Sequence, residues 1–210
     1  MNIKANAYQA LNPSSVVKLR CPSCRQRATL EQLNVHDGAI SSAAENFTVG
    51  TRRCPDPACF ALVFFVMKNG LLVDSYPAET IDFDAANVPV AVQSAFEEAI
   101  KCHAQRCFVA SAIMVRKTLE ELCTDRKAVG PDLKQRIKAL GTKVLLPTEL
   151  LEGLDDLRLL GNDAAHIESR EYEKVGQEEV EIGIEFTKEV LKAVYQYSAL
   201  LSKLRALKKP

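Results

Sequence analysis

Two pairs of closely spaced cysteines are the residues of this sequence with the clearest capacity for chemistry. Cys21 and Cys24 form a C-x-x-C knuckle, and Cys54 and Cys59 form a looser C-x4-C knuckle. Two short loops that each offer two thiolates can close a tetrahedral Zn²⁺ site, and four sulfur ligands leave no open position for water. The spacing therefore predicts a structural zinc site.

Redox chemistry and chance spacing are the alternatives for these cysteines. A redox C-x-x-C is typical of a thioredoxin-like βαβ setting, and the surrounding sequence lacks that pattern. The total of seven cysteines is odd, which disfavours a secreted disulfide scaffold and favours a metal in a reducing compartment. His36 lies between the two pairs and could replace one thiolate, although a solvated loop histidine is the simpler interpretation.

The composition indicates a folded chain. The 210 residues include 27 basic and 27 acidic side chains and are 47% hydrophobic, which excludes a disordered or low-complexity protein. No apolar run reaches the roughly 18 residues of a membrane-spanning helix, and the N-terminal stretch lacks the apolar centre of a signal peptide. We therefore expect a soluble, cytoplasmic protein with no membrane partner.

The elements that must position the cysteines belong to a β-rich first third. Residues 15–20 predict a short strand, and ALVFFVMK and LLVDSY flank Asn69-Gly70, the strongest two-residue hairpin signal. Together they predict a zinc ribbon over residues 1–77, too small to fold without its metal. The acidic, proline-containing stretch 78–89 predicts a linker.

Residues 90–210 are predicted to form an all-α helical bundle, which makes the fold class α+β. The predicted helices follow a helical apolar period and cover residues 91–104, 106–125, 131–140, 147–168 and 177–207. The last helix carries one apolar stripe over about 45 Å, longer than a small bundle is wide. Its end either packs on another subunit or on the ribbon, or it frays as a lysine-rich segment.

Five arginines cluster around the cysteine knuckles, namely Arg20, Arg25, Arg27, Arg52 and Arg53. One interpretation is that this cluster, with Arg52 and Arg53 as binding residues, contacts nucleic-acid phosphates. The alternative is that it neutralises the negative charge of a four-thiolate zinc site. The lack of aromatic residues interleaved with the arginines favours the second interpretation, because single-strand binders use such rings for stacking.

A polar face on the fourth predicted helix is the second group of chemical interest. Arg158, Asn162 and His166 recur every four residues and therefore share one helical face. The second predicted helix offers Arg116 and Glu120, also four residues apart, as binding residues opposite this face.

This face has two interpretations. A histidine as general acid or base, with an arginine stabilising a phosphorane, suffices for metal-independent RNA cleavage. Alternatively, Asn162 and His166 are buried polar residues that bond to Glu120 or to backbone and fix the helix pairing. Gly161 lies in mid-helix, where glycine costs about 1 kcal/mol relative to alanine, and this predicts a close approach by another helix or by a ligand.

The run IMVRKTLEEL, followed on the fourth predicted helix by LDDLRLLGNDAAH, resembles a bacterial domain-of-unknown-function family. That family occurs behind zinc ribbons and attached to type I restriction subunits, and it belongs with the HEPN superfamily of helical domains. The resemblance covers about residues 80–205. Many HEPN proteins are dimeric ribonucleases in defence or toxin–antitoxin systems, and others serve as nucleotide-binding, RNA-binding or dimerisation modules.

The ribonuclease signature of that superfamily is an arginine, often followed by a polar residue, and then four to six residues to a histidine. His166 matches the histidine, and Asn162 takes the place of the polar residue. Arg158 departs from the signature, because seven residues separate it from His166. The resemblance therefore implies His166, Arg158 and Asn162 as catalytic candidates.

These observations lead to one hypothesis with two alternatives. The hypothesis is a zinc-ribbon, HEPN-like binding module associated with nucleic acid or a nucleotide, in bacterial defence or stress response. We expect a homodimer with RNA, a nucleotide or a protein as partner. The first alternative is a metal-independent endoribonuclease that uses His166 and Arg158, and the second is a structural dimerisation or docking protein.

Overall fold

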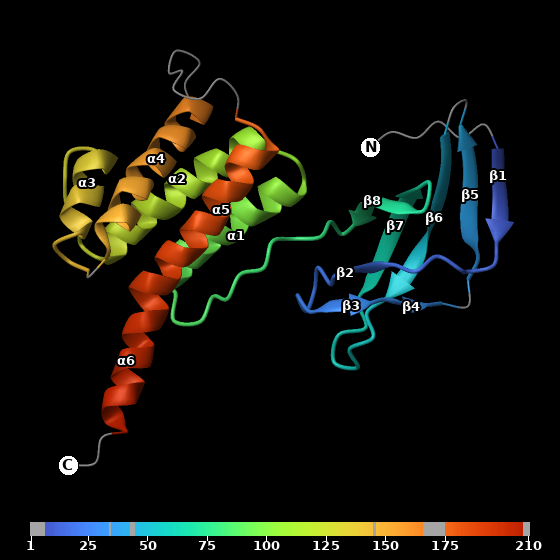
Figure 1. Ribbon diagram of the computed structural model, residues 1–210, viewed down its shortest axis with the longest axis horizontal. Helices are drawn as coiled ribbons and strands as arrows, with labels where there is room; N and C mark the ends of the chain where they lie inside the picture. Colours follow the sequence, from blue (N-terminus) through green and yellow to red (C-terminus); the bar gives the residue numbers. More distant parts are fainter. Residues whose placement is uncertain (1–6, 34, 43–44, 145, 166–174, 208–210) are drawn as a thin grey trace. The chain divides into compact units, whose positions relative to one another are not determined.

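The computed structural model describes residues 7–33, 35–42, 45–144, 146–165 and 175–207. The chain divides into two compact units, which we call the β unit, Met1–Asp82, and the helical unit, Phe83–Pro210 (Figure 1). Antiparallel strands followed by helices confirm the predicted α+β class. No helix in the described ranges is long and apolar enough to cross a membrane.

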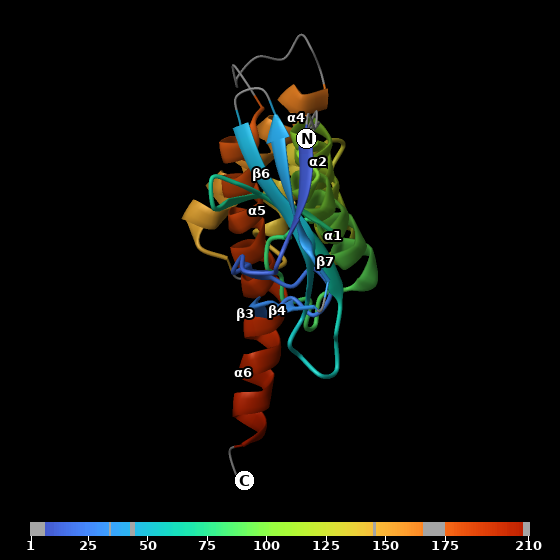
Figure 2. The ribbon, with the colours of Figure 1, turned by 90° about the vertical axis from the view of Figure 1, so that its right-hand side faces the viewer.

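The β unit contains the strands β1 (Ala7–Leu11), β2 (Lys18–Arg20), β3 (Arg27–Thr29), β4 (Glu31–Gln32), β5 (Asp37–Ser42), β6 (Glu45–Arg53), β7 (Leu62–Lys68) and β8 (Leu71–Tyr76). One antiparallel sheet has the order β1-β5-β6-β7-β8 (Figure 1), and β4 pairs with the end of β6; Figure 2 shows β4, β6 and β7 from a second side. A separate hairpin is formed by β2 and β3. The predicted strand in residues 15–20 is thus confirmed in its second half.

The β7–β8 hairpin forms around Asn69-Gly70 as predicted. Both residues have positive φ, 51° and 79°, which the favoured two-residue hairpin turn requires at both central positions. The inward side chains of β7 pack against the β2–β3 side of the unit in a small core, consisting of Val17, Leu19, Leu30, Val63, Phe65, Met67 and the partly buried Leu72.

The stretch predicted as a linker is divided between the two units. Glu79 accepts a 2.9 Å hydrogen bond from the backbone N–H of Arg20, and Asp82 lies 3.2 Å from the Arg20 guanidinium. Phe83, in contrast, packs edge-on against Phe96 of the first helix, with ring centroids 4.7 Å apart. Each half of the stretch is therefore anchored to its own unit, and the boundary falls at Asp82–Phe83.

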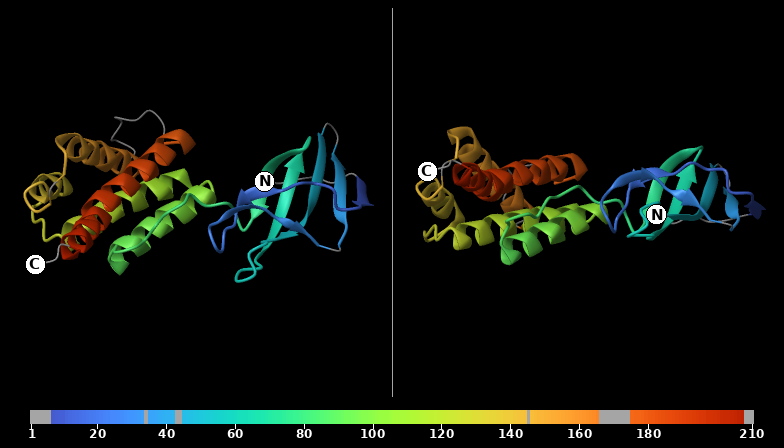
Figure 3. Two further views of the ribbon diagram at one scale, coloured as in Figure 1. Left: turned by 60° about the horizontal axis from the view of Figure 1, so that its bottom comes forward. Right: turned by 90° about the horizontal axis from the view of Figure 1, so that it is seen from below.

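The helical unit contains α1 (Val90–Ala104), α2 (Phe108–Asp125), α3 (Leu133–Leu140), α4 (Thr148–Ala165), α5 (Gln177–Leu191), the π-helical turn η1 (Lys192–Gln196) and α6 (Tyr197–Ala206). Within the described residues these elements lie where helical periodicity predicted them, except that the last predicted helix contains a π-helical turn; positions 166–168 of the fourth predicted helix lie outside those residues. α2 packs against both α1 and α4. α5, η1 and α6 follow one another without a break, and α6 continues past the end of the bundle (Figures 1 and 3).

Candidate functional site

The four knuckle cysteines converge on one point of the β unit. All four Sγ atoms lie within 4.8 Å of one another, with Cys21 and Cys59 separated by 3.8 Å and Cys24 and Cys54 by 3.6 Å. A tetrahedral site with Zn–S bonds of about 2.3 Å places its sulfur atoms about 3.8 Å apart. The cluster is therefore compatible with a four-thiolate metal site. His36 is exposed and does not belong to it.

Backbone hydrogen bonds shape both knuckles. The N–H of Arg25 donates to the carbonyl of Cys21 at 2.8 Å, and the N–H of Cys21 donates to the carbonyl of Gln26 at 2.9 Å. In the second knuckle, the N–H of Cys54 donates to the carbonyl of Ala61 at 2.8 Å. These bonds fix the turns that aim the thiols at a common centre.

The thiols of the cluster differ in acidity. Burial raises the pKa of Cys54 to about 12, whereas a backbone hydrogen bond with Ala61 lowers the pKa of Cys59 to about 7. A metal binds thiolates, so loading the site must release protons, above all from Cys54.

Arg52 is fully buried and engaged inside the β unit. Its Nη1 and Nη2 donate to the two carboxylate oxygens of Asp37 at 2.8 and 2.7 Å, and Nη2 also donates to the carbonyl of Ser15 at 3.0 Å. The guanidinium lies 4.5 Å from the centre of the Phe65 ring. The prediction that Arg52 contacts phosphate is therefore wrong, because its charge is already paired and shielded from solvent.

Arg53 points to the opposite face of β6. Its Nε and Nη2 donate to Oε2 of Glu31 at 3.0 and 2.7 Å, and its guanidinium stacks 4.7 Å from the centre of the exposed Phe60 ring. Arg20 and Arg27 likewise pair with carboxylates that follow β8 in the same unit. These arginines thus bind neighbouring acidic residues.

Aromatic side chains gather on the outer face of β7 and β8, which was not predicted from the sequence. Phe64 is exposed, whereas its neighbours Val63 and Phe65 are fully buried, so Phe64 points away from the core. Tyr76 lies directly opposite Phe64 in the antiparallel register, and opposed residues share a face. Tyr76 is 73% exposed.

Arg53 belongs to the same face. The register pairs it with Leu62, which is exposed like Phe64 two residues further along β7. We call Arg53, Phe60, Phe64 and Tyr76 the aromatic face. The absence of aromatic residues beside the arginines in the sequence was therefore misleading, because strand pairing brings them together in space.

The approach predicted at Gly161 is made by another helix. A Cβ at this position would overlap the Cβ of Arg116 on α2 and lie 3.0 Å from the Ala112 carbonyl oxygen. Arg116 in turn donates from Nη1 to the Arg158 carbonyl at 3.3 Å, and its Nε lies 3.5 Å from the carboxylate of Glu120. The structure thus brings Arg116 and Glu120 together at the α2–α4 contact.

The side chain of Arg158 is held on its own helix. Its Nε donates to Oδ1 of Asp155 at 2.6 Å, and this hydrogen bond lowers the pKa of the Asp155 carboxyl. Asn162 is half-buried one turn further on. His166, the predicted acid or base, lies outside the described residues.

Substitution of Gly161 by valine is expected to lower the free energy of unfolding of the helical unit by about 2 kcal/mol or more, because overpacking a tight contact costs about 1–3 kcal/mol and valine is β-branched. Urea unfolding followed by circular dichroism at the helix band measures this change. Asp156→Ala, at an exposed position of the same helix, serves as control and should change stability by less than about 0.5 kcal/mol. Equal stability of Gly161→Val and the control would contradict the contact.

The helical unit also defines the relationship of the chain to known proteins. A family model described as Domain of unknown function (DUF4145) matches residues 97–209, which is more than half of the chain. Comparisons with curated proteins and with solved structures give no match. The chain therefore belongs to the DUF4145 family, through a helical domain that follows a cysteine-bearing β unit.

Proposed function

We propose that this protein is a single-stranded nucleic-acid-binding module whose aromatic face stacks on the bases. The observation that carries the proposal is the placement of Phe60, Phe64 and Tyr76 beside Arg53 on one exposed sheet surface. Stacking of a base on an aromatic ring contributes about 1–3 kcal/mol, and arginine adds cation–π and phosphate contacts. Three exposed rings on a small unit have no role in its core.

We also propose that the four cysteines bind Zn²⁺ and that the β unit is a zinc ribbon. Four thiolates at tetrahedral spacing suit zinc, and a site that is filled by protein ligands is structural. Cys54 directly follows β6, and Cys59 directly precedes Phe60. The metal site would therefore fix the strand end and the loop that carry Arg53 and Phe60.

The sequence resemblance of the helical unit to HEPN-like domains supports a role in bacterial defence or stress response. It also supports a second candidate function, a metal-independent endoribonuclease acting through Arg158, Asn162 and His166. The meeting of Arg116 with the backbone of Arg158 favours this candidate, because it gathers two arginines at one helix contact. It ranks second because Asp155 and Glu120 already pair with their guanidinium groups.

Replacement of Phe64 and Tyr76 together by alanine is expected to weaken binding of single-stranded RNA roughly 30-fold or more, because two stacking contacts of about 1–3 kcal/mol each are lost. Fluorescence anisotropy of a labelled oligouridine with the zinc-loaded full chain measures this change. Tyr8→Ala removes another exposed aromatic ring, from β1 at the opposite edge of the sheet, and should bind like the wild type.

Three outcomes of this comparison decide between the candidates. Failure of the wild type to bind the oligonucleotide, or an equal loss in Tyr8→Ala, would refute the role of the aromatic face. If the wild type cleaves RNA during a short incubation with EDTA and His166→Ala does not, the endoribonuclease would be established instead. Binding that depends on Phe64 and Tyr76 without cleavage would leave a binding module.

A further inference from the structure

The helical rod formed by α5, η1 and α6 carries an apolar stripe that its own unit covers only in part, since the Phe186 ring packs on Gly153 of α4. Ile182 is 63% exposed on α5, and Leu200 and Leu204 are 64% and 58% exposed on α6. We call this stripe the outer stripe; its positions are Ile182, Phe186, Glu189, Ala193, Tyr197, Leu200 and Leu204. The described residues of α6 from Leu200 onward are all exposed, because α6 has passed the end of the bundle (Figure 3).

The π-helical turn keeps the outer stripe on one side of the rod. A helical stripe needs steps that alternate between three and four residues, but the steps on either side of Ala193 are both of four. The turn Lys192–Gln196 is π-helical, and its i→i+5 bonding accommodates one extra residue. The stripe therefore stays continuous, and its spacing is the same in both directions from Ala193.

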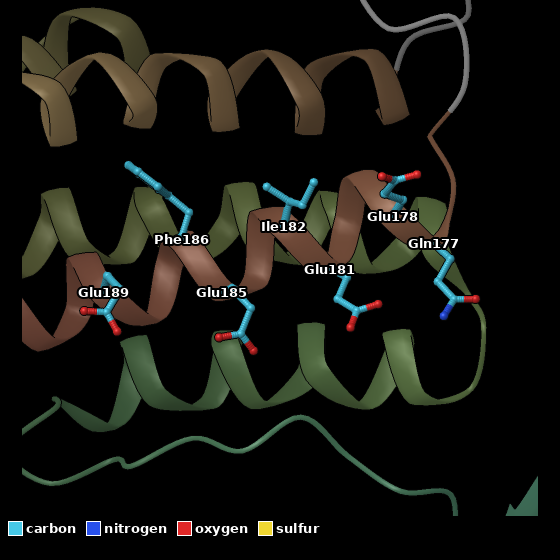
Figure 4. Close-up of a pocket in the computed structure, with 7 residues that line it drawn as sticks. All are labelled: Gln177, Glu178, Glu181, Ile182, Glu185, Phe186 and Glu189. Atoms are coloured by element: carbon cyan, nitrogen blue, oxygen red, sulfur yellow. The ribbon is translucent and has the colours of Figure 1, made fainter.

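The two halves of the rod differ in charge. On α5, the stripe is flanked by glutamates in a groove of about 830 Å³, lined by Gln177, Glu178, Glu181, Ile182, Glu185, Phe186 and Glu189. In Figure 4, Ile182 and Phe186 point to one side of α5, and Glu181 and Glu185 to the other. On α6, the leucines are accompanied by the exposed Lys203 and Arg205. An acidic apolar groove thus lies at one end and a basic apolar helix at the other.

We propose that two copies of this chain pair antiparallel along the rod, each placing its α6 in the α5 groove of the other. A two-fold axis at Ala193 sets Ile182 opposite Leu204 and Phe186 opposite Leu200 of the other copy. The symmetric spacing is what such an interface requires, because both copies contribute the same surface. A chain cannot fill its own groove, since its α5 and α6 belong to one continuous rod.

The charges fit the same register. Lys203 of one copy lies level with the stretch between Glu181 and Glu185 of the other, on the same side of the contact, and the second set of charges forms by symmetry on the far side of the axis. From Ile182 to Leu204 the stripe extends about 33 Å at 1.5 Å per residue, so the contact is long enough to resemble an antiparallel coiled coil. This inference stands on the helical unit and is independent of the nucleic-acid proposal.

Analytical ultracentrifugation of the zinc-loaded full chain tests the pairing. The wild type is expected to be a dimer, and Leu200→Glu with Leu204→Glu to weaken association roughly 100-fold or more, because two charges replace the apolar centre of each contact. Leu71→Glu, an exposed leucine of the β unit, is the matched control and should remain dimeric. Circular dichroism verifies that each variant is folded.

Charge reversal tests the register itself. Glu181→Arg and Lys203→Glu should each weaken the dimer, and the combined variant should restore it, because the reversed pair again has opposite signs. A monomeric wild type would overturn the proposal, as would a dimer that is unaffected by Leu200→Glu with Leu204→Glu. Combined charge reversal that fails to restore a dimer weakened by both single reversals would overturn the antiparallel register.

Discussion

Removal of the metal from the four-cysteine site is expected to unfold the β unit and to leave the helical unit folded. The site joins two knuckles from distant parts of the sequence, and the core beneath them contains only a few side chains. Structural zinc contributes about 10–16 kcal/mol of apparent binding free energy at neutral pH, which equals or exceeds the entire stability of a typical domain.

Two measurements on the full chain can monitor this unfolding of the β unit and the loss of the metal. Chelation, or Cys54→Ser, should make residues of the β unit susceptible to limited proteolysis, while a helical fragment beginning near Phe83 persists. Elemental analysis should find one zinc per wild-type chain and less than one in Cys54→Ser. Cys107→Ser, which removes an exposed thiol outside the cluster, is the control. A chelated chain as protease-resistant as the loaded one would contradict the structural role of the site.

Local signals predicted most of the elements because those signals lie within a few residues. The helical apolar period located the helices of the described residues, although it predicted α5, η1 and α6 as one helix, and Asn69-Gly70 located the β7–β8 turn. The cysteine cluster was predictable because each pair of cysteines is local and only the joining of the two pairs is not. The close contact at Gly161 was predictable in part, because a glycine in mid-helix indicates a close neighbour but does not identify the element that provides it.

The inward placement of Arg52 and the outward placement of Arg53 could not be predicted from a cluster of basic residues in the sequence. Arg52 and Arg53 are adjacent on β6, so the alternation of a strand sends one inward and the other outward. Their proximity to the second knuckle suggested a common role, and β6 was not predicted around them. The choice of which one is buried depends on Asp37, which reaches Arg52 only through the pairing of β5 with β6.

Two features were not predicted from the sequence: the aromatic face and the π-helical turn. Phe64 and Tyr76 become neighbours only in the register of β7 with β8. The π-helical turn had a sequence signal, the two consecutive four-residue steps around Ala193, which a search for regular helical periodicity passes over. Both features depend on how separate positions are related, the first through the strand register and the second through the spacing on either side of Ala193, and a search for local patterns does not compare such positions.

Substitution of Arg52 by alanine is expected to lower the free energy of unfolding of the β unit by about 3–5 kcal/mol, because it leaves the carboxylate of Asp37 buried without its partner. Asp37 is 1% exposed and Arg52 is fully buried, so water does not replace the lost bonds. Urea unfolding of the zinc-loaded chain, followed by circular dichroism at the β-sheet band, measures the loss.

The double variant Arg52→Met with Asp37→Ala separates the cost of an unpaired charge from the value of the pair. Replacing both members of a buried ion pair with apolar groups is often close to neutral, so the double variant should be more stable than Arg52→Ala alone. Arg53→Ala, which removes a half-exposed ion pair from the outer face of the same strand, should cost only about 0–1 kcal/mol. If Arg52→Ala cost no more than Arg53→Ala, the inward placement of Arg52 would be refuted, and its guanidinium would again be available for phosphate.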